Sequence, residues 1–339
     1  MTTPKGVGLD SLPVIDLSKI HSDREGLAAK LVHAMEHVGF VYLDNVPGFN
    51  STELLRMASW FLTQPEQWKK QVATKVWNPN PEVKNLYRGY FPVDPKASSY
   101  KEGFEIGIDL PGDDPDSKMT VLYEPNLWPV EDATSPSFRQ YMTDYYKNMT
   151  EIGIDIMQLI AIGLEIEENS FTRIFSEKPL STLRLIRYPR RYDTPPEVAH
   201  GCDGHPLHCN EHSDSVFLTL LATFNYAGLQ IQNEQGHWVN VTPRPNGLVM
   251  NIGDVLQQMT GGRLKATRHR VLDLGVERMS VAFFLEPNYH ADISRALIEP
   301  KLKDGSHLTD ATNTTYGPWL INRMKNTKKN AEYKDADFY

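Results

Sequence analysis

Residues 210–221 read Asn-Glu-His-Ser-Asp-Ser-Val-Phe-Leu-Thr-Leu-Leu. The apolar end of this stretch, Val216 to Leu221, has the length and composition of a buried strand. His212 and Asp214 lie just before it. In a strand, residues two positions apart point to the same face, so this imidazole and this carboxylate can be directed at one point. Polar groups beside a buried strand need a partner, and a metal ion can be that partner.

A second histidine, His269, completes the pattern. It lies 55 positions after Asp214, in a predicted strand at residues 267–271 that can return to the same sheet. Two histidines and one carboxylate bind Fe(II) on one face and leave coordination positions open, which is the arrangement of non-haem iron oxygenases. A lone histidine in a strand is usually structural, so the predicted metal site depends on the three residues together.

Arg278 and Ser280 form a second polar pair on one predicted strand face. They lead into the apolar run 281–285, so a guanidinium and a hydroxyl would point into an apolar interior. A buried arginine needs an anionic partner, and a bidentate pair with the carboxylate of a ligand meets that need. An ion pair with a protein carboxylate, such as Glu277 or Asp273, is an equally good interpretation of the pattern.

Short strand-like segments separated by turn residues fill the C-terminal half of the chain and predict a sandwich or barrel. Before them, residues 137–164 carry apolar side chains at helical spacing and predict a long scaffold helix against the sheet. Shorter helices are predicted to begin at capping residues Ser22 and Asn50. The strands are expected at residues 183–188, 216–221, 229–232, 238–241, 248–252, 267–271 and 279–285.

The composition is that of an ordinary globular protein. The chain has 339 residues, of which 40% are hydrophobic and 23% charged, and a net charge of −8 that argues against a nucleic-acid surface. Two cysteines do not make a disulfide framework, and the polar N-terminus has no apolar core of signal-peptide type. We therefore predict a cytoplasmic protein without nucleic-acid or membrane partners; its oligomeric state cannot be read from the sequence.

An ordered set of motifs resembles the Fe(II)/2-oxoglutarate-dependent dioxygenases, and within them the isopenicillin N synthase-like branch. The motifs are weak singly and strong as a set, and with residues 12–17 and 36–43 the resemblance covers almost the whole chain. The C-terminal motifs are residues 210–214, 228–231, 251–254, 260–271 and 278–284.

The resemblance implies a mainly β fold, with a double-stranded β-helix (jelly roll) core and flanking helices. It divides the chain into an N-terminal region (1–130), scaffold helices (131–180), the jelly-roll core (181–290) and a C-terminal helical tail (291–339). It implies that the Fe(II) ligands are His212, Asp214 and His269. It also implies that 2-oxoglutarate is held by Arg278, Ser280 and Tyr188.

Two departures from the family pattern concern the co-substrate. Ile186 stands where many relatives have an asparagine two positions before the tyrosine, and the run 186–189 is similar to isopenicillin N synthase itself. Arg88 likewise resembles the arginine that binds the substrate carboxylate in that enzyme. However, the synthase carries a glutamine near its C-terminus, and this chain has no glutamine after Gln258. The sequence therefore favours 2-oxoglutarate.

The predicted function is oxidation of an unactivated C–H bond in a small organic substrate, by hydroxylation, desaturation or cyclisation. Fe(II) is the predicted cofactor, with 2-oxoglutarate and O2 as co-substrates and succinate and CO2 as products. Substrate contacts are expected from Arg88, Arg184 and Phe283; the alternatives are exposed cations for the two arginines and core packing for Phe283. An oxidase of isopenicillin N synthase type, or a non-catalytic metal-binding protein, remains the alternative for the whole chain.

Three further histidines, His200, His205 and His208, lie near the triplet together with Cys202 and Cys209. Such a composition suits zinc, but the spacing fits no standard zinc site. We interpret this segment as a mobile loop over the entrance to the site.

Overall fold

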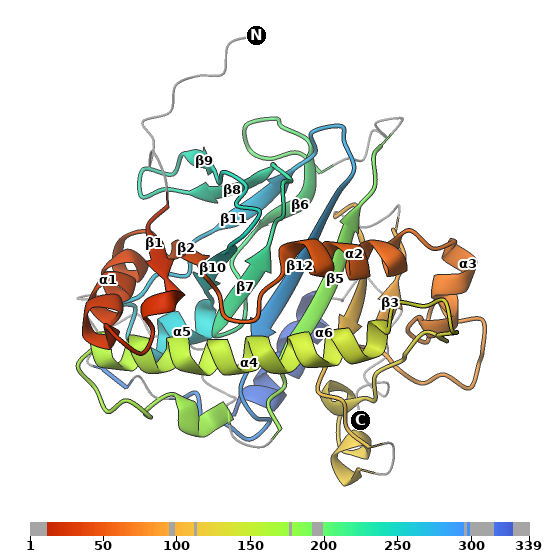
Figure 1. The fold of residues 1–339 in the computed structure, drawn as a ribbon, viewed down its shortest axis with the longest axis horizontal. Coiled ribbons are helices and arrows are strands. Elements are labelled where there is room, and N and C mark those ends of the chain that lie inside the picture. Colours follow the sequence, from red (N-terminus) through yellow and green to blue (C-terminus); the bar gives the residue numbers. More distant parts are fainter. Residues whose placement is uncertain are drawn as a thin grey trace.

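Two β-sheets face each other and form the centre of the molecule in this computed structural model (Figure 1). The structure describes residues 12–94, 99–111, 114–175, 178–191, 199–294, 297–298 and 315–327. The larger sheet has eight strands and the smaller sheet has four. Helices flank this core, so the predicted mainly β fold of jelly-roll type with flanking helices is confirmed.

The larger sheet combines strands from both ends of the chain. Its order is β1-β2-β10-β7-β12-β5-β4-β3, so the early strands β1 to β4 lie on both sides of the later ones. β1 is parallel to β2, and the other pairs are antiparallel. The strands are β1 (Val14–Asp16), β2 (Phe40–Asp44), β3 (Gly89–Phe91), β4 (Glu102–Ile106), β5 (Thr182–Tyr188), β7 (Leu218–Ala222), β10 (Leu248–Ile252) and β12 (Arg278–Leu285).

The smaller sheet has the order β6-β11-β8-β9. Its first strand corrects the prediction of a mobile loop, because His208 and Cys209 lie inside β6 and are buried. In the described part of the chain, the clusters that could hold a metal do not include His200, His205 or His208. The strands are β6 (Leu207–His212), β8 (Leu229–Gln232), β9 (Trp238–Asn240) and β11 (His269–Leu272).

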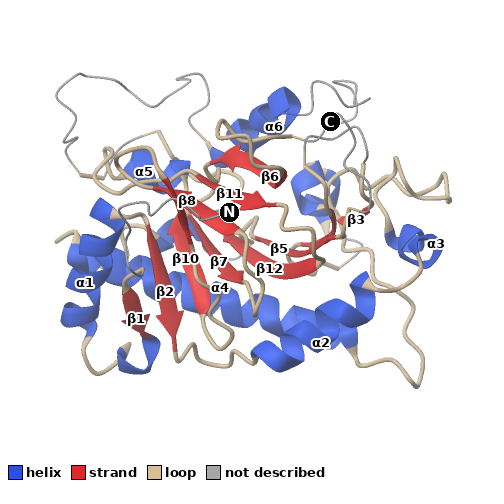
Figure 2. Cartoon of the chain, turned by 90° about the horizontal axis from the view of Figure 1, so that it is seen from above, coloured by secondary structure: helices blue, strands red, loops and turns tan. Residues whose placement is uncertain are grey.

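The helices cover the outer face of the larger sheet and one end of the sandwich. Figure 2 shows α2 and α4 on one side of this sheet and α6 on the other. Short 3-10 turns occur at Leu17–Lys19, Lys70–Val72, Pro115–Lys118, Val121–Tyr123 and Thr172–Phe175. The α-helices are α1 (Arg24–His37), α2 (Ser51–Leu62), α3 (Glu66–Lys69), α4 (Phe138–Gly163), α5 (Asp254–Met259) and α6 (Tyr316–Thr327).

The predicted scaffold helix matches α4 closely, because its apolar stripe packs on the sheet. Asn50 caps α2 as predicted, accepting a hydrogen bond from the backbone N–H of Glu53. The predicted cap of α1 is wrong by one residue: Asp23, and not Ser22, accepts the hydrogen bond from Gly26. Among the described residues, no helix combines the length and the apolar character needed to cross a membrane.

Candidate active site

Three side chains converge between the two sheets. His212 is the last residue of β6 and His269 the first of β11, and they pair directly across these antiparallel strands. Asp214 lies in the irregular segment two residues after β6, not in the strand itself. Nε2 of each histidine is 3.6 Å from Oδ1 of Asp214. Strand pairing thus brings together two imidazoles and a carboxylate that are distant in the sequence.

Backbone carbonyls orient both imidazoles. Nδ1 of His212 is 2.7 Å from the carbonyl oxygen of Asn210, and Nδ1 of His269 is 3.2 Å from that of Thr267. A carbonyl oxygen only accepts, so each Nδ1 carries the proton and donates it. Each Nε2 is then directed toward the other two groups, and in the neutral imidazole it carries the lone pair that a metal ion can bind. Such outer hydrogen bonds are what fixes histidine ligands in metal sites.

The carboxylate of Asp214 is held in the same way. Its Oδ2 accepts hydrogen bonds from the hydroxyl of Thr219, at 2.6 Å, and from the side-chain amide of Asn251, at 2.8 Å. Its backbone carbonyl accepts from the N–H of Asp254, at 2.7 Å. Oδ1 therefore remains free to face the two imidazoles. Thr219 and Asn251 were not predicted as site residues, although Asn251 belongs to one of the family motifs and both are polar residues within apolar strands.

The electrostatics of the three groups differ. Burial by itself raises the pKa of Asp214, but His269, His212 and Asn251 together hold this pKa well below its usual range. Burial lowers the pKa of His269. Burial also works against a charged His212, but Cys209 and Asp214 outweigh it and raise the pKa of His212 to about 9. The site therefore offers an ionised carboxylate and one neutral imidazole, and a metal ion would displace a proton from the other.

The donor set fits a divalent iron ion. The ligand atoms of His212, Asp214 and His269 all lie within 4.8 Å of one another, and they approach from one side of a cavity. Two nitrogens and one oxygen on a single face leave the opposite positions open, as in non-haem Fe(II) oxygenases.

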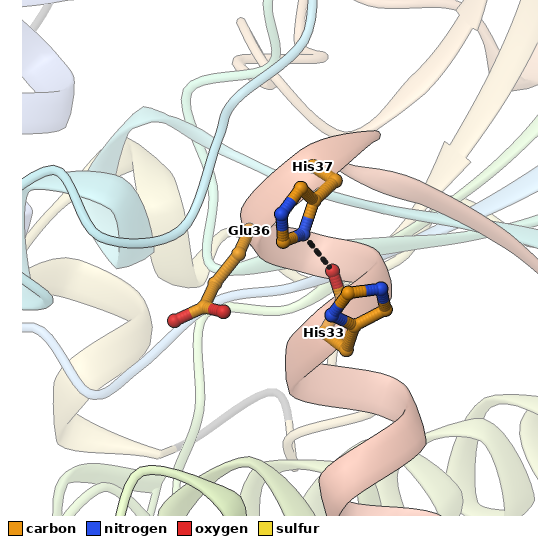
Figure 3. Close-up of side chains that lie close together, drawn as sticks. All are labelled: His33, Glu36 and His37. Carbon is orange, nitrogen blue, oxygen red and sulfur yellow. Dashed lines mark hydrogen bonds between the residues drawn. The ribbon is translucent and has the colours of Figure 1, made fainter.

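A second cluster, His33, Glu36 and His37, also brings its possible ligand atoms within 4.8 Å of one another but lies on the exposed side of α1. Figure 3 shows that the carboxylate of Glu36 is turned away from the two rings. Nε of Arg263 donates a hydrogen bond to this carboxylate at 2.5 Å. None of the three residues lines the cavity of the buried triad. The buried triad is therefore the better metal site.

The cavity beside the triad has a volume of about 600 Å³ and lies between the two sheets. Arg278, Ser280 and Tyr188 line it and are at most 3% exposed. Arg278 and Tyr188 pair across β12 and β5, and the guanidinium carbon lies 4.6 Å from the centre of the tyrosine ring. The structure thus places the three predicted 2-oxoglutarate residues in one wall of the cavity.

Both protein carboxylates considered as partners for Arg278 are engaged elsewhere. Glu277 pairs with Arg187, and Asp273 pairs with Arg191. Among the described residues, Nε of Arg278 has no hydrogen-bond partner. Burial of a guanidinium group with an unpaired Nε lowers the stability of the fold unless an anion binds to the group. An anionic ligand in the cavity could therefore be held at Arg278.

Arg184 lies in the same wall, as its position on the face of Tyr188 predicted. It is not free, however: Nε and Nη2 of Arg184 lie 2.8 and 2.6 Å from Oε1 of Glu105. The guanidinium carbon also lies 5.0 Å from the ring centre of Phe284. The pair of Arg184 and Glu105, with Phe284 beside it, gives the cavity a polar and aromatic surface.

Phe283 does not line this cavity, which corrects the prediction. It is fully buried on the other face of β12, with its ring centre 5.4 Å from that of Tyr146 on α4. Strand residues alternate between faces, so Ser280 and Phe284 share the cavity face whereas Phe283 belongs to the packing under α4.

Arg88 is also not a cavity residue, although its neighbour Tyr87 is. Its guanidinium is buried, and Nη1 donates to the hydroxyl of Thr182 at 2.8 Å. That hydroxyl in turn donates to Oε2 of Glu286 at 2.9 Å. Arg88 therefore compensates a buried carboxylate from outside the cavity, and the prediction that it contacts substrate is corrected.

Replacing Arg88 with methionine is expected to lower the free energy of unfolding by about 3 kcal/mol, because Glu286 loses its buried counter-charge. Chemical denaturation measures this change. Arg173→Met is the control, since its side chain is 71% exposed and its loss is expected to matter by less than about 0.5 kcal/mol. An Arg88→Met protein as stable as the parent would contradict the structural role.

Other cavity residues were not predicted. Lys101 precedes β4, Cys209 is in β6, and Leu320 and Met324 belong to α6 at the C-terminal end of the described chain. The sequence predicted helical structure in this tail, but not that its apolar side chains cover the cavity. Contacts between segments this distant leave no local pattern.

Comparisons with known proteins agree with this geometry. Residues 181–287 match the 2OG-Fe(II) oxygenase superfamily, and residues 12–131 match the N-terminal region described as non-haem dioxygenase in morphine synthesis. The chain is 32% identical to the 2-oxoglutarate-dependent dioxygenase citB of Monascus ruber, covering 68% of this chain and 74% of the relative. It is 29% identical to isopenicillin N synthase of Streptomyces clavuligerus, covering 93% and 94%.

Comparison with a solved structure indicates the same family. The chain is similar to a full-length protein of Neurospora crassa that was crystallised in complex with alpha-KG, which is 2-oxoglutarate, and thymine. The TM-score is 0.76 at 25% identity, with 95% of this chain and 99% of the other covered. The chain therefore belongs to the 2OG-Fe(II) oxygenase superfamily and is a 2-oxoglutarate-dependent dioxygenase with Fe(II) as its cofactor.

Proposed function

We propose that His212, Asp214 and His269 hold the Fe(II) of this enzyme. The observation that carries the proposal is the convergence of two Nε2 atoms on Oδ1 of Asp214, each at 3.6 Å. The carbonyls behind the histidines, and the donors to Oδ2 of Asp214, leave only these three atoms for the metal. When bound, the iron and O2 supply the oxidative decarboxylation of 2-oxoglutarate and the oxidation of a substrate C–H bond.

The wall formed by Arg278, Ser280 and Tyr188 is the proposed site for the distal carboxylate of 2-oxoglutarate. Arg278 can bind it in a bidentate pair, and the hydroxyls of Ser280 and Tyr188 can donate further hydrogen bonds. Because these side chains are buried, the bound carboxylate is shielded from water and the pairing is strengthened. The keto acid is thereby oriented with its other end toward the metal ligands.

The substrate is proposed to be a small organic molecule. The cavity of about 600 Å³ has the size of a small-molecule site, and the similar Neurospora crassa structure contains thymine. The wall of Arg184, Glu105 and Phe284 is proposed to orient the substrate, while Leu320 and Met324 of α6 keep water from the reacting C–H bond. The reaction proposed is the oxidation of that bond; hydroxylation, desaturation and cyclisation all begin from it.

Oxidation of isopenicillin N synthase type, without 2-oxoglutarate, is the alternative against which this co-substrate is tested, because Ile186 stands in place of an asparagine. Anaerobic addition of 2-oxoglutarate to the Fe(II) protein separates the two. We expect a new visible absorption band and, after O2 is admitted, Fe(II)-dependent formation of succinate. Absence of both the band and succinate, with Fe(II) bound, would reject the proposed use of 2-oxoglutarate.

Replacing Asn251 with alanine is expected to lower the affinity for Fe(II) by about 10- to 100-fold, because the carboxylate of Asp214 loses one of the donors that orient it. Anaerobic titration with Fe(II) measures this. Asn240→Ala is the matched control, since Asn240 is exposed in β9 and its side chain accepts a hydrogen bond from Gln230. Equal affinities of the Asn251 variant and the parent would argue against the orienting role.

A further inference from the structure

Lys101 is, besides Arg278 at the proposed 2-oxoglutarate site, a cation of the cavity with no carboxylate beside it. Its Nζ lies 3.6 Å from Sγ of Cys209, and among the described residues it forms no ion pair with a carboxylate. By contrast, Arg184 pairs with Glu105, and Arg323 of α6 pairs with Asp254. Lys101 is half-buried in the cavity wall, and an ammonium group there without an opposite charge is unfavourable. The position of Lys101 is therefore suited to a bound anion.

The register of the strands places Lys101 away from the proposed site of 2-oxoglutarate. Glu102, the first residue of β4, pairs with Arg187 of β5, which places Lys101 beside Tyr188. Arg278 pairs with Tyr188 from the other side, on β12. The tyrosine therefore lies between the two cations. Lys101 instead shares the cavity-facing side of β4 with Glu105, and thus belongs to the wall of the cavity that remains for the substrate.

A count of the charges in the filled site also indicates that Lys101 suits a substrate anion. With Fe(II) and 2-oxoglutarate bound as proposed, the positive charges of the metal and Arg278 are balanced by Asp214 and the two negative charges of the keto acid. Arg184 and Arg323 are balanced by their carboxylate partners, and Glu286 by Arg88 through Thr182. Lys101 then has the thiol of Cys209 beside it but no carboxylate of its own, and a carboxylate on the substrate is a group that matches its charge.

We propose that Lys101 binds a carboxylate of the substrate, so that the enzyme oxidises a small carboxylic acid. This inference rests on the function proposed above. The ammonium group would hold one end of the acid while the C–H bond to be oxidised lies toward His212, Asp214 and His269. Lys101 would thereby select for acids over neutral analogues of the same size.

The test uses the Fe(II) enzyme with 2-oxoglutarate, O2 and a panel of small carboxylic acids, each paired with its primary amide. The measured quantity is the stimulation of succinate formation, expressed for each compound relative to the same variant without it. At least one acid is expected to be effective at about 10-fold lower concentration than its amide, as charge-assisted hydrogen bonds predict. Lys101→Met and Lys101→Gln are expected to remove this preference, and Lys101→Arg to keep much of it.

Cys209→Ser is the matched control for the thiol that contacts the ammonium, and the acid preference should survive in it. The proposal is overturned if no acid acts at lower concentration than its amide, if either neutral variant keeps the preference, or if Cys209→Ser abolishes it. Thermal unfolding shows which variants are folded. Because each acid is compared with its amide in the same variant, the result does not depend on how much folded protein that variant yields. A parent enzyme that forms no succinate at all would instead reject the proposed function.

Discussion

Replacing His269 with alanine is expected to reduce Fe(II)-dependent succinate formation by more than about 100-fold. Loss of a hydrogen bond to a metal ligand already lowers metal affinity or activity by about 10- to 100-fold, and loss of the ligand itself lowers it further. The side chain is buried against Phe40 and ends at the carboxylate of Asp214, so no neighbouring group can replace its Nε2. Succinate measured over time, and the iron content of the purified protein, both report the loss.

His33→Ala is the matched control for this change. It removes an imidazole from the other cluster that could hold a metal, on the exposed side of α1. Its iron content and succinate formation are expected to equal those of the parent. If His33→Ala lost activity while His269→Ala kept it, the metal would be at the surface of α1 and the buried triad would have another role.

Replacing Arg278 with alanine is expected to raise the KM for 2-oxoglutarate by about 10- to 100-fold, since a hydrogen-bonded charge pair contributes about 1.5–3 kcal/mol. The guanidinium has no carboxylate partner among the described residues, so its interaction energy is available to the ligand. Arg278→Lys is expected to give a smaller increase, because an ammonium group keeps the charge but cannot form the bidentate pair. Initial rates at varied 2-oxoglutarate concentration measure both effects.

Arg173→Ala serves as the control for loss of an arginine side chain outside the cavity. It is expected to leave the KM for 2-oxoglutarate unchanged. The same KM in Arg278→Ala as in the parent would show that 2-oxoglutarate binds elsewhere in the cavity. A loss of folding, seen as a lowered midpoint of thermal unfolding, would be recognised separately, and Arg278→Lys would then carry the test.

The metal triad could be predicted because it depends on short-range rules. His212 and Asp214 are two positions apart beside an apolar strand, and His269 begins a strand of ordinary appearance. Alternation along β12 similarly placed Arg278 and Ser280 on one face. What the sequence could not show was how the carboxylate is oriented, because its donors come from two other strands.

The errors have identifiable physical causes. Phe283 was expected to face the substrate, although the alternation that places Ser280 in the cavity puts Phe283 on the opposite face. Arg88 was assigned by resemblance, and the structure turns its guanidinium toward Thr182. His208 was placed in a mobile loop because the polar composition of the segment obscured β6, where it is buried.

The most direct measurement is a crystal structure of the protein grown with Fe(II) and 2-oxoglutarate without O2. We expect a single iron ion bound by Nε2 of His212, Oδ1 of Asp214 and Nε2 of His269, with the distal carboxylate of 2-oxoglutarate on Arg278. Iron bound at another place, or an imidazole of His269 turned away from it, would contradict the account.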